Sequence, residues 1–389
     1  MCGTNRLRGI DHRVPHDLIV NILEKLPIKS LVRFKYVSKQ WFELITDTYF
    51  IYRHLLNQTK KHRLFFSVRF SLIPLPALCS WNSPRRCLPM ESMVVNRDST
   101  LSYSHTRMFY HFEDYYDMVN SCDGILCFNG RGDICVYNPA TKEYRCLPTG
   151  LYCRKDRRRL GFGRDLVTDR YKIVKLFNPS LSTAEEDVDS CAVFTLDPNP
   201  KACWKTIGVV PYRISAYSHS TYVNGAIYWF TDEIRHLNKS EVIIMFDLHT
   251  EKFEPIPHPN RCSDERRSNM QLVTLRECLC LVHQEPDYQL SIWMMQQQKI
   301  TWEKLYCIQH PDLQNDLRPG GPRFAFAEHK DGTLLVCTRF HVYLYKQNDV
   351  IRCVPRKYAE DRYGPCVTTS FTESLVPVYG KTLRHQNTG

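Results

Sequence analysis

Residues 14–56 read VPHDLIVNILEKLPIKSLVRFKYVSKQWFELITDTYFIYRHLL, and their pattern differs from that of the rest of the chain. Apolar side chains recur there at helical spacing from Leu18 to Leu26, and Pro27 marks the end of this first predicted helix. Pro15 suits its first turn, because the N–H that proline lacks would have no partner there. The stretch therefore begins with a predicted amphipathic helix.

Two further helices are predicted in this stretch. The second carries its apolar side chains on one face, namely Leu31, Phe34, Val37, Trp41 and Ile45. Thr46 or Asp47 is the expected cap of a third, short helix, whose apolar face holds Phe50, Ile51, His54 and Leu55. So short a module cannot bury all these side chains by itself, since domains near 40 residues usually need a partner, a metal or a disulfide. The surplus apolar surface is expected either to bind another protein or to pack against the rest of the chain.

The same stretch closely resembles the F-box motif. The resemblance is carried by residues 14–19, 22–31, 33–41, 44–45 and 50–55, with Val14 and Tyr36 departing from the residues most usual there. It implies binding to the Skp-type adaptor that links F-box proteins to a cullin. The residues that it places in the adaptor contact are Pro15, Leu18, Ile19, Leu23, Leu26, Pro27, Leu31, Val37 and Trp41. A buried aromatic anchor such as Trp41 is typical of the residues that dominate such interfaces.

From Leu64 onward, short apolar runs alternate with turn signals. Dipeptides typical of hairpin turns are Asp123-Gly124, Asn129-Gly130, Asn224-Gly225 and Asp331-Gly332. The predicted strands include residues 134–137, 172–177, 191–196, 226–230, 242–247, 289–294, 333–338 and 342–346. The 22 Tyr and 19 Phe of the chain also favour strands over a long helical bundle.

A loose repeat runs through these strands. Its units start at Gly124, Tyr171, Gly225, Glu277 and Gly332, which by residue number lie 47 to 55 residues apart. The strongest internal similarity joins residues 136–148 to residues 245–257. A period near 50 indicates a kelch-like β-propeller of about six blades, in which residues 370–378 pair with a strand such as Leu64–Val68 to close the ring. A β-sandwich built from the same hairpins is the alternative.

This region also resembles the F-box-associated domain of large plant F-box families. The resemblance is carried by residues 121–127, 137–141 and 160–163, with Asp165 and residues 167–174 after them. It implies that the domain binds the protein to be ubiquitinated. The predicted fold class is α+β and multidomain, a three-helix F-box followed by an all-β domain. The predicted organisation is a polar tail at 1–13, the F-box at 14–56, a linker with the first β segments at 57–119, the F-box-associated domain at 120–378 and a tail at 379–389.

The composition of the chain indicates in which cellular compartment the protein acts and whether it holds disulfides or metals. No stretch approaches the roughly 18 consecutive apolar residues of a membrane-spanning helix, and residues 1–13 lack the apolar core of a secretory signal. The cytoplasm or the nucleus is therefore expected, with no membrane as partner. The 17 cysteines are odd in number and include no C-x-x-C pair, so free thiols are predicted and no metal site.

The net charge of +11 is spread over short clusters. No long basic stripe of the kind that binds nucleic acid is present, so solvated loops are the expected role of most of these cations. Arg157, Arg158 and Arg159 form the one cluster with a candidate role, binding of an acidic target. Gly161-Phe162-Gly163 lacks the third glycine of a nucleotide-binding loop and is predicted to be a turn between strands.

Neither a catalytic motif nor a cofactor is predicted. The predicted function is that of the substrate-recognition subunit of a Skp-cullin-F-box ubiquitin ligase. Such a subunit recruits an unidentified target protein for ubiquitination and proteasomal degradation without catalysing a reaction. The alternative is a nucleic-acid- or carbohydrate-binding β-propeller with a helical cap, which the net charge and the aromatic residues would suit.

Overall fold

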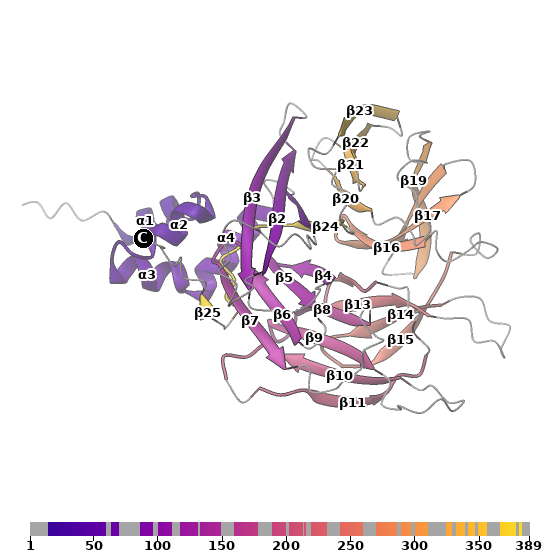
Figure 1. Ribbon diagram of the computed structural model, residues 1–389, viewed down its shortest axis with the longest axis horizontal. Coiled ribbons are helices and arrows are strands. Elements are labelled where there is room, and N and C mark those ends of the chain that lie inside the picture. The colour runs from indigo at the N-terminus through magenta and orange to yellow at the C-terminus, as the bar shows by residue number, and fades with distance from the viewer. Residues whose placement is uncertain are drawn as a thin grey trace, which may run out of the picture.

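The structure is a computed structural model, and helices precede strands along the chain (Figure 1). It describes residues 15–59, 64–69, 86–95, 100–110, 117–130, 133–148, 159–177, 189–199, 202–212, 214, 219–231, 242–259, 270–285, 289–296, 300–309, 324–328, 332–338, 341–346, 349–355, 366–378 and 381–382. The helices lie at one side of the β-domain (Figure 1).

Four helices form the N-terminal module, where three were predicted. They are α1 (His16–Leu23), α2 (Ile28–Phe34), α3 (Lys39–Thr46) and α4 (Thr48–Thr59). The second predicted helix is in fact two, because the chain becomes extended at Ser38, whose side chain accepts a hydrogen bond of 3.2 Å from the N–H of Trp41. The last helix is capped by Asp47, which was one of the two predicted caps. Its Oδ1 accepts a hydrogen bond of 3.1 Å from the N–H of Phe50.

The strands described form six antiparallel sheets. One sheet joins β24 (Cys366–Phe371), β1 (Leu64–Arg69), β2 (Arg86–Val95) and β3 (Leu101–Tyr110). The next joins β4 (Asp117–Cys122), β5 (Ile125–Asn129), β6 (Asp133–Asn138), β7 (Glu143–Pro148) and β25 (Lys381–Thr382). A third joins β8 (Leu160–Asp165), β9 (Arg170–Phe177), β10 (Ser190–Thr195) and β11 (Lys205–Val209).

The remaining three sheets repeat the same order of four strands. They are β12 (Thr221–Val223), β13 (Ala226–Phe230), β14 (Val242–Asp247) and β15 (Phe253–Pro257); β16 (Met270–Leu275), β17 (Cys278–Glu285), β18 (Gln289–Gln296) and β19 (Thr301–Gln309); and β20 (Ala325–Glu328), β21 (Leu334–Cys337), β22 (His341–Lys346) and β23 (Asp349–Pro355). All eight strands predicted above are present in the six sheets, with ends that differ from the prediction by at most two residues.

The six sheets are the blades of a β-propeller. The first strands β4, β8, β12, β16, β20 and β24 contact one another in turn and complete a ring, with β24 beside β4. This confirms the predicted propeller, and the β-sandwich alternative is wrong. The predicted repeat units begin at or just before the second strand of successive blades, as Gly124 does before β5 and Gly225 before β13.

The ring closes where the C-terminal part of the chain returns to the first strand. Leu64 of β1 pairs with Phe371 of β24, and Val68 pairs with Val367. Closure on residues 64–68 was predicted, but the closing strand ends at Phe371, so residues 372–378 lie outside it. Since β1, β2 and β3 form this blade with β24, the segment 57–119 supplies three of its four strands.

Gly161 and Gly163 lie inside β8 and not in the predicted turn. A Cβ on Gly161 would lie 2.7 Å from Ile227 Cγ2 and 2.8 Å from Trp229 Cζ2, and one on Gly163 would overlap the ring of Tyr222. Strand β8 therefore needs glycine because the side chains of the next blade occupy the space that a side chain would fill.

Candidate functional site

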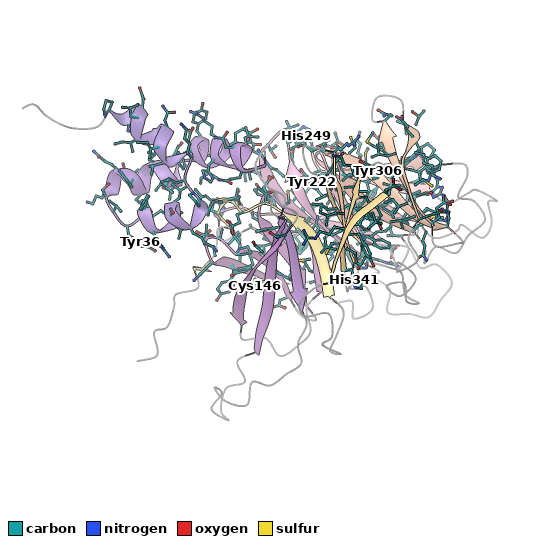
Figure 2. All side chains as sticks on the ribbon, turned by 90° about the horizontal axis from the view of Figure 1, so that it is seen from above. Tyr36, Cys146, Tyr222, His249, Tyr306 and His341 are labelled. Carbon is teal, nitrogen blue, oxygen red and sulfur yellow. The ribbon has the colours of Figure 1, made fainter. Side chains whose placement is uncertain are left out.

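The helices expose a group of large apolar side chains. Leu18 and Ile22 of α1, Tyr36 and Val37 after α2, and Phe42 of α3 are all more than half exposed, and Tyr36 reaches 88%. Figure 2 labels Tyr36 on the helical part of the molecule. An exposed group of this kind usually marks a protein interface. These five residues are called the exposed helical face below.

The exposed helical face exists because a second set of apolar residues fills the core between the helices. That core contains Leu23, Ile28, Leu31, Ile45, Phe50 and, from the C-terminal end of the chain, Leu375. In α1, Leu18 and Ile22 are four residues apart and share one side, while Leu23 points to the core. The helical spacing of the apolar residues thus divides them between a buried and an outward side.

The predicted adaptor-binding residues divide in the same way. Pro15, Leu18, Pro27 and Val37 are exposed, and Ile19, Leu26 and Trp41 are half-buried, whereas Leu23 and Leu31 are fully buried. The Trp41 ring packs edge-on against Phe34, with 5.2 Å between the ring centroids. Leu23 and Leu31 accordingly support the face from beneath.

Three members of the exposed helical face were not among the predicted contact residues. Ile22 could have been found from its position one turn after Leu18. The sequence marks Tyr36 only as a departure from the motif, and Phe42 lies outside the apolar face predicted for the second helix. The exposure of Tyr36 depends on the end of α2 at Phe34, which the helical pattern alone does not show.

Helix α4 joins the helices to the propeller. Leu55 and Ile51 pack into the core of the blade β4–β7 and its neighbour. Tyr52, three residues before Leu55, lies on the exposed side of α4. The guanidinium carbon of Arg164 in β8 lies over its ring, 5.2 Å from the ring centroid. The last helix of the module is thus partly a component of the β-domain.

Arg164 stands at the centre of a polar cluster at this contact. Its Nη1 lies 3.2 Å from Asp123 Oδ2 and its Nη2 lies 2.7 Å from Asp169 Oδ1. Tyr171 donates a hydrogen bond of 2.9 Å to the same Asp123 oxygen. Burial and the nearby Asp123 raise the pKa of Tyr171 well above its usual value, so the phenol remains a donor. The cluster therefore holds the turn before β5, strand β8 and α4 in one arrangement.

The segment 372–378 makes a second connection between helices and propeller. Leu375 lies in the helical core, while Val376 and Val378 lie in the core of the first blades. Asn138 at the end of β6 donates from Nδ2 to the carbonyl oxygens of Ser374 and Val376, at 3.1 and 2.8 Å. The chain thereby returns from the last blade to the F-box.

Gly124 lets this segment approach the propeller closely. A Cβ there would lie 2.6 Å from the carbonyl oxygen of Thr372, and its φ of +80° also favours glycine. Next to it, the hydroxyl of Ser374 donates a hydrogen bond of 2.5 Å to the carbonyl of Asp123. The turn Asp123-Gly124 is thus both the predicted hairpin turn and a docking point for residues 372–374.

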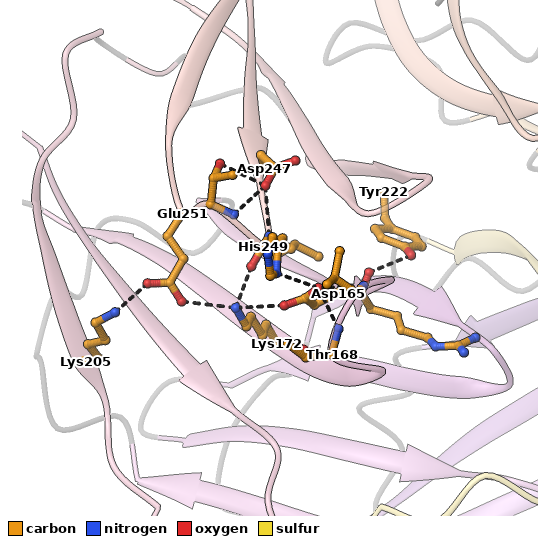
Figure 3. A network of polar contacts seen from close by, with 12 residues as sticks. Asp165, Thr168, Lys172, Lys205, Tyr222, Asp247, His249 and Glu251 are labelled. Atoms are coloured by element: carbon orange, nitrogen blue, oxygen red, sulfur yellow. Dashed lines mark hydrogen bonds and ion pairs between the residues drawn. The ribbon is translucent and has the colours of Figure 1, made fainter. Parts of the chain in front are cut away.

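A charged network joins the blade β8–β11 to the blade β12–β15 (Figure 3). Lys172 Nζ lies 3.2 Å from Asp165 Oδ2 and 3.1 Å from Glu251 Oε1, and Lys205 Nζ lies 2.7 Å from Glu251 Oε2. Burial acts to raise the pKa of Asp165. Hydrogen bonds from Thr168 and from the N–H of Val167, together with the contact with Lys172, outweigh burial and lower this pKa to about 2. Each charge faces an opposite charge, so the network holds the two blades together.

The pocket beside this network is small. It has a volume of about 210 Å³ and is lined by Val193, Thr195, Asp197, Asn199, Ala202, Cys203, Lys205 and Glu251. Ligand pockets usually measure roughly 300–1,000 Å³. Its Lys205 and Glu251 pair with each other and its Asp197 pairs with Arg170, so each charged side chain of the lining already has a partner of opposite charge.

The predicted target-binding arginines are only partly described. Arg157 and Arg158 lie outside the described residues. Arg159, just before β8, lies with its Nη1 2.5 Å from Asp189 Oδ1, just before β10, and both side chains are largely buried. Arg159 is therefore already paired within its own blade.

The part of the chain that the structure describes has neither a metal-binding cluster nor a membrane-spanning helix. No group of three or more His, Cys, Asp or Glu side chains there could hold a metal ion. Among the four helices described, none combines the length and the apolar character needed to span a membrane.

Comparison with known proteins assigns both parts of the chain. Residues 12–53 match the F-box domain, and residues 81–378 match the F-box associated beta propeller domain. An F-box/LRR-repeat protein of Arabidopsis thaliana is 29% identical over 93% of this chain and 82% of its own length. An F-box/LRR-repeat/kelch-repeat protein of the same plant is 29% identical over 76% of this chain and 77% of its own length. Among solved structures, the Dos1 propeller aligns with a TM-score of 0.37 at 10% identity, over 70% of this chain and 68% of that one.

Proposed function

Because this chain belongs to the F-box proteins that carry an F-box associated β-propeller domain, we propose that it is the substrate-recognition subunit of a Skp-cullin-F-box ubiquitin ligase. The exposed helical face binds a Skp-type adaptor, and through it a cullin. The propeller holds a target protein, which the assembled ligase ubiquitinates for proteasomal degradation. The protein acts in the cytoplasm or the nucleus.

The observation that carries the proposal is the position of the exposed helical face. Its five apolar side chains lie within residues 18–42, inside the segment that matches the F-box domain. The buried set, including Leu23 and Leu31, already fills the core of the module, so these five are not needed there. Apolar side chains that a fold leaves outside its core suit a partner surface.

The mechanism is positional. A ligase subunit that binds the adaptor at one site and the target at another raises the effective concentration of target lysines near a ubiquitin-charged enzyme. The contacts of α4 and of residues 372–378 with the propeller suit this task, because they limit movement between the two binding sites. No side chain of this protein needs to take part in the chemical step.

The test is capture of a purified Skp-type adaptor by the full-length chain and by two matched variants. Val37 on the exposed helical face and Val209 on the outer strand β11 are 62% and 66% exposed. Val37→Asp should abolish capture, because it places a charge in the apolar contact, while Val209→Asp should leave capture unchanged. Circular dichroism and the thermal midpoint should remain at the wild-type values in both. Capture by Val37→Asp at wild-type strength would contradict the proposed surface.

Point variants are preferable here to deletion of the helices. A chain that starts at residue 60 would lose Leu55 and Ile51 from the propeller core and leave Leu375 without its helical neighbours. Trp41 is also a poor choice, since it packs against Phe34 and its replacement would disturb the helices. Leu18→Asp, at a half-exposed position in α1, provides an independent second variant.

A further inference from the structure

Two free cysteines face each other on neighbouring strands of the blade β4–β7. Cys135 of β6 is the register partner of Cys146 of β7, and their sulfur atoms are 3.5 Å apart. Cys135 is buried, while Cys146 is partly exposed. Cys146 lies in the middle of β7, and Figure 2 labels it on the side of the molecule that carries the helices.

The backbone geometry at this pair suits a disulfide. Residues directly opposite each other on antiparallel strands have Cα atoms about 4.5–5.5 Å apart. Disulfides join Cα atoms that are about 4.4–6.8 Å apart, with a sulfur–sulfur bond of about 2.05 Å. The two sulfurs therefore need to approach by roughly 1.5 Å, which side-chain rotation can supply without moving the strands.

We propose that Cys135 and Cys146 form a reversible disulfide by exchange with a small-molecule disulfide of the glutathione type. In the first step the Cys146 thiolate, having released its proton, attacks oxidised glutathione, forms a mixed disulfide and expels one glutathione thiolate. In the second step the Cys135 sulfur loses its proton and attacks the Cys146 sulfur, expelling the second glutathione. The two cysteines are oxidised and one glutathione disulfide is reduced to two thiols.

The order of the steps follows from the surroundings of each sulfur. A glutathione disulfide can reach only a thiol that solvent reaches, and that thiol is Cys146. The hydrogen bond with Cys146 and burial raise the pKa of Cys135 well above its usual value, so Cys135 stays protonated in the resting protein. Once Cys146 carries glutathione, its sulfur is the neighbour that Cys135 can attack.

The site lies close to the connection between propeller and helices. Strand β6 ends at Asn138, which binds the carbonyls of Ser374 and Val376, and β7 starts at Glu143, whose carboxylate accepts from the N–H of Val378 at 3.2 Å. A bond between Cys135 and Cys146 would thus cross-link the hairpin on which residues 374–378 dock.

The experiment is a redox titration of the full-length protein. The protein is equilibrated with a series of ratios of oxidised to reduced glutathione, the free thiols are alkylated, and the tryptic peptides are mapped without reduction. Cys135 falls in peptide 132–142 and Cys146 in peptide 146–154, which also contains Cys153. For this reason the wild type is compared with three variants, Cys146→Ser, Cys135→Ser and Cys153→Ser. Cys203, an exposed free thiol, reports simple mixed-disulfide formation.

The expected result is a cross-link between the two peptides that rises with the proportion of oxidised glutathione and disappears on reduction. It should persist in Cys153→Ser and be lost in Cys146→Ser and Cys135→Ser. Cys203 should stop at the mixed disulfide. A mixed disulfide on Cys146 that never proceeds to the cross-link would overturn the proposal. So would a cross-link that is lost in Cys153→Ser and kept in Cys146→Ser.

Discussion

The guanidinium of Arg164 lies over the ring of Tyr52, 5.2 Å from its centroid, so the first strand of a blade touches the last helix of the F-box. The same guanidinium pairs with Asp123 and Asp169 in two hairpin turns. A single side chain therefore connects α4 to two neighbouring blades. Together with residues 372–378, this contact sets the direction in which the propeller faces relative to the exposed helical face.

Arg164→Ala should lower the free energy of unfolding by about 2–4 kcal/mol, because it leaves Asp123 with its oxygen partly buried beside Tyr171 and without a cation. Chemical denaturation gives the value. The control is Arg170→Ala, which removes a more exposed ion pair with Asp197 and should therefore cost clearly less than Arg164→Ala. Equal effects of the two substitutions would show that Arg164 adds nothing beyond a surface ion pair.

Asn138→Asp should destabilise the protein by about 2 kcal/mol, since a carboxylate cannot donate to the carbonyls of Ser374 and Val376. The matched control is Asp247→Asn at the equivalent turn of the blade β12–β15. There the Oδ1 atom only accepts, from the N–H groups of His249 and Thr250, and an amide oxygen can do the same. Thermal melts of the two variants should therefore differ, and a larger loss in Asp247→Asn would refute this account of Asn138.

Gly163→Ala should cost about 1–3 kcal/mol, because the added methyl group overlaps the ring of Tyr222. The double variant Gly163→Ala with Tyr222→Ala should lose less stability than the sum of the two single variants, since removal of the ring makes room for the methyl group. Urea denaturation of the wild type, the two single variants and the double variant gives the four unfolding free energies that this comparison needs. Strict additivity would mean that the ring is not what makes glycine necessary at this position.

Acid should weaken the charged network at the junction of the blades β8–β11 and β12–β15, because it protonates Asp165, the partner of Lys172. The pKa of Asp165 is lowered from 3.8 to about 2 in the folded protein. A carboxyl group with a depressed pKa contributes stability that is complete above about pH 4 and is lost as the pH falls toward 2. The loss should reach about 2 kcal/mol. Asp165→Asn should show a smaller fall in unfolding free energy over the same pH range, and an identical fall would contradict the role of Asp165.

Much of the fold was predictable because its signals are local. The alternation of apolar residues, the dipeptides Asp123-Gly124 and Asn224-Gly225 and the similarity of residues 136–148 to 245–257 depend only on residues near one another in the chain. The structure explains that similarity: Asn138 and Asp247 begin the same turn, each with Oδ1 2.9 Å from the N–H two residues later. Local patterns of this kind identify hairpins and repeats.

Errors arose where the outcome depends on contacts between distant residues. The helical pattern from Leu31 to Ile45 runs through Ser38, so the break between α2 and α3 was missed. Gly161-Phe162-Gly163 was predicted to be a turn because glycine often marks turns, whereas the side chains of the next blade demand it within β8. In the candidate site, the motif could not separate the exposed Leu18 and Val37 from the buried Leu23 and Leu31.

The sequence by itself determined the F-box, the hairpin repeat and the return of the chain to Leu64, since each of these follows from spacing along the chain or from a motif. Only the tertiary structure decided which apolar side chains remain outside the helical core and which atoms meet across the junction. Arg164 with Tyr52, Asn138 with Val376 and Cys135 with Cys146 are brought together by strand register and blade packing. Such pairings depend on the relative placement of whole elements, which is settled only when the ring closes and the cores pack.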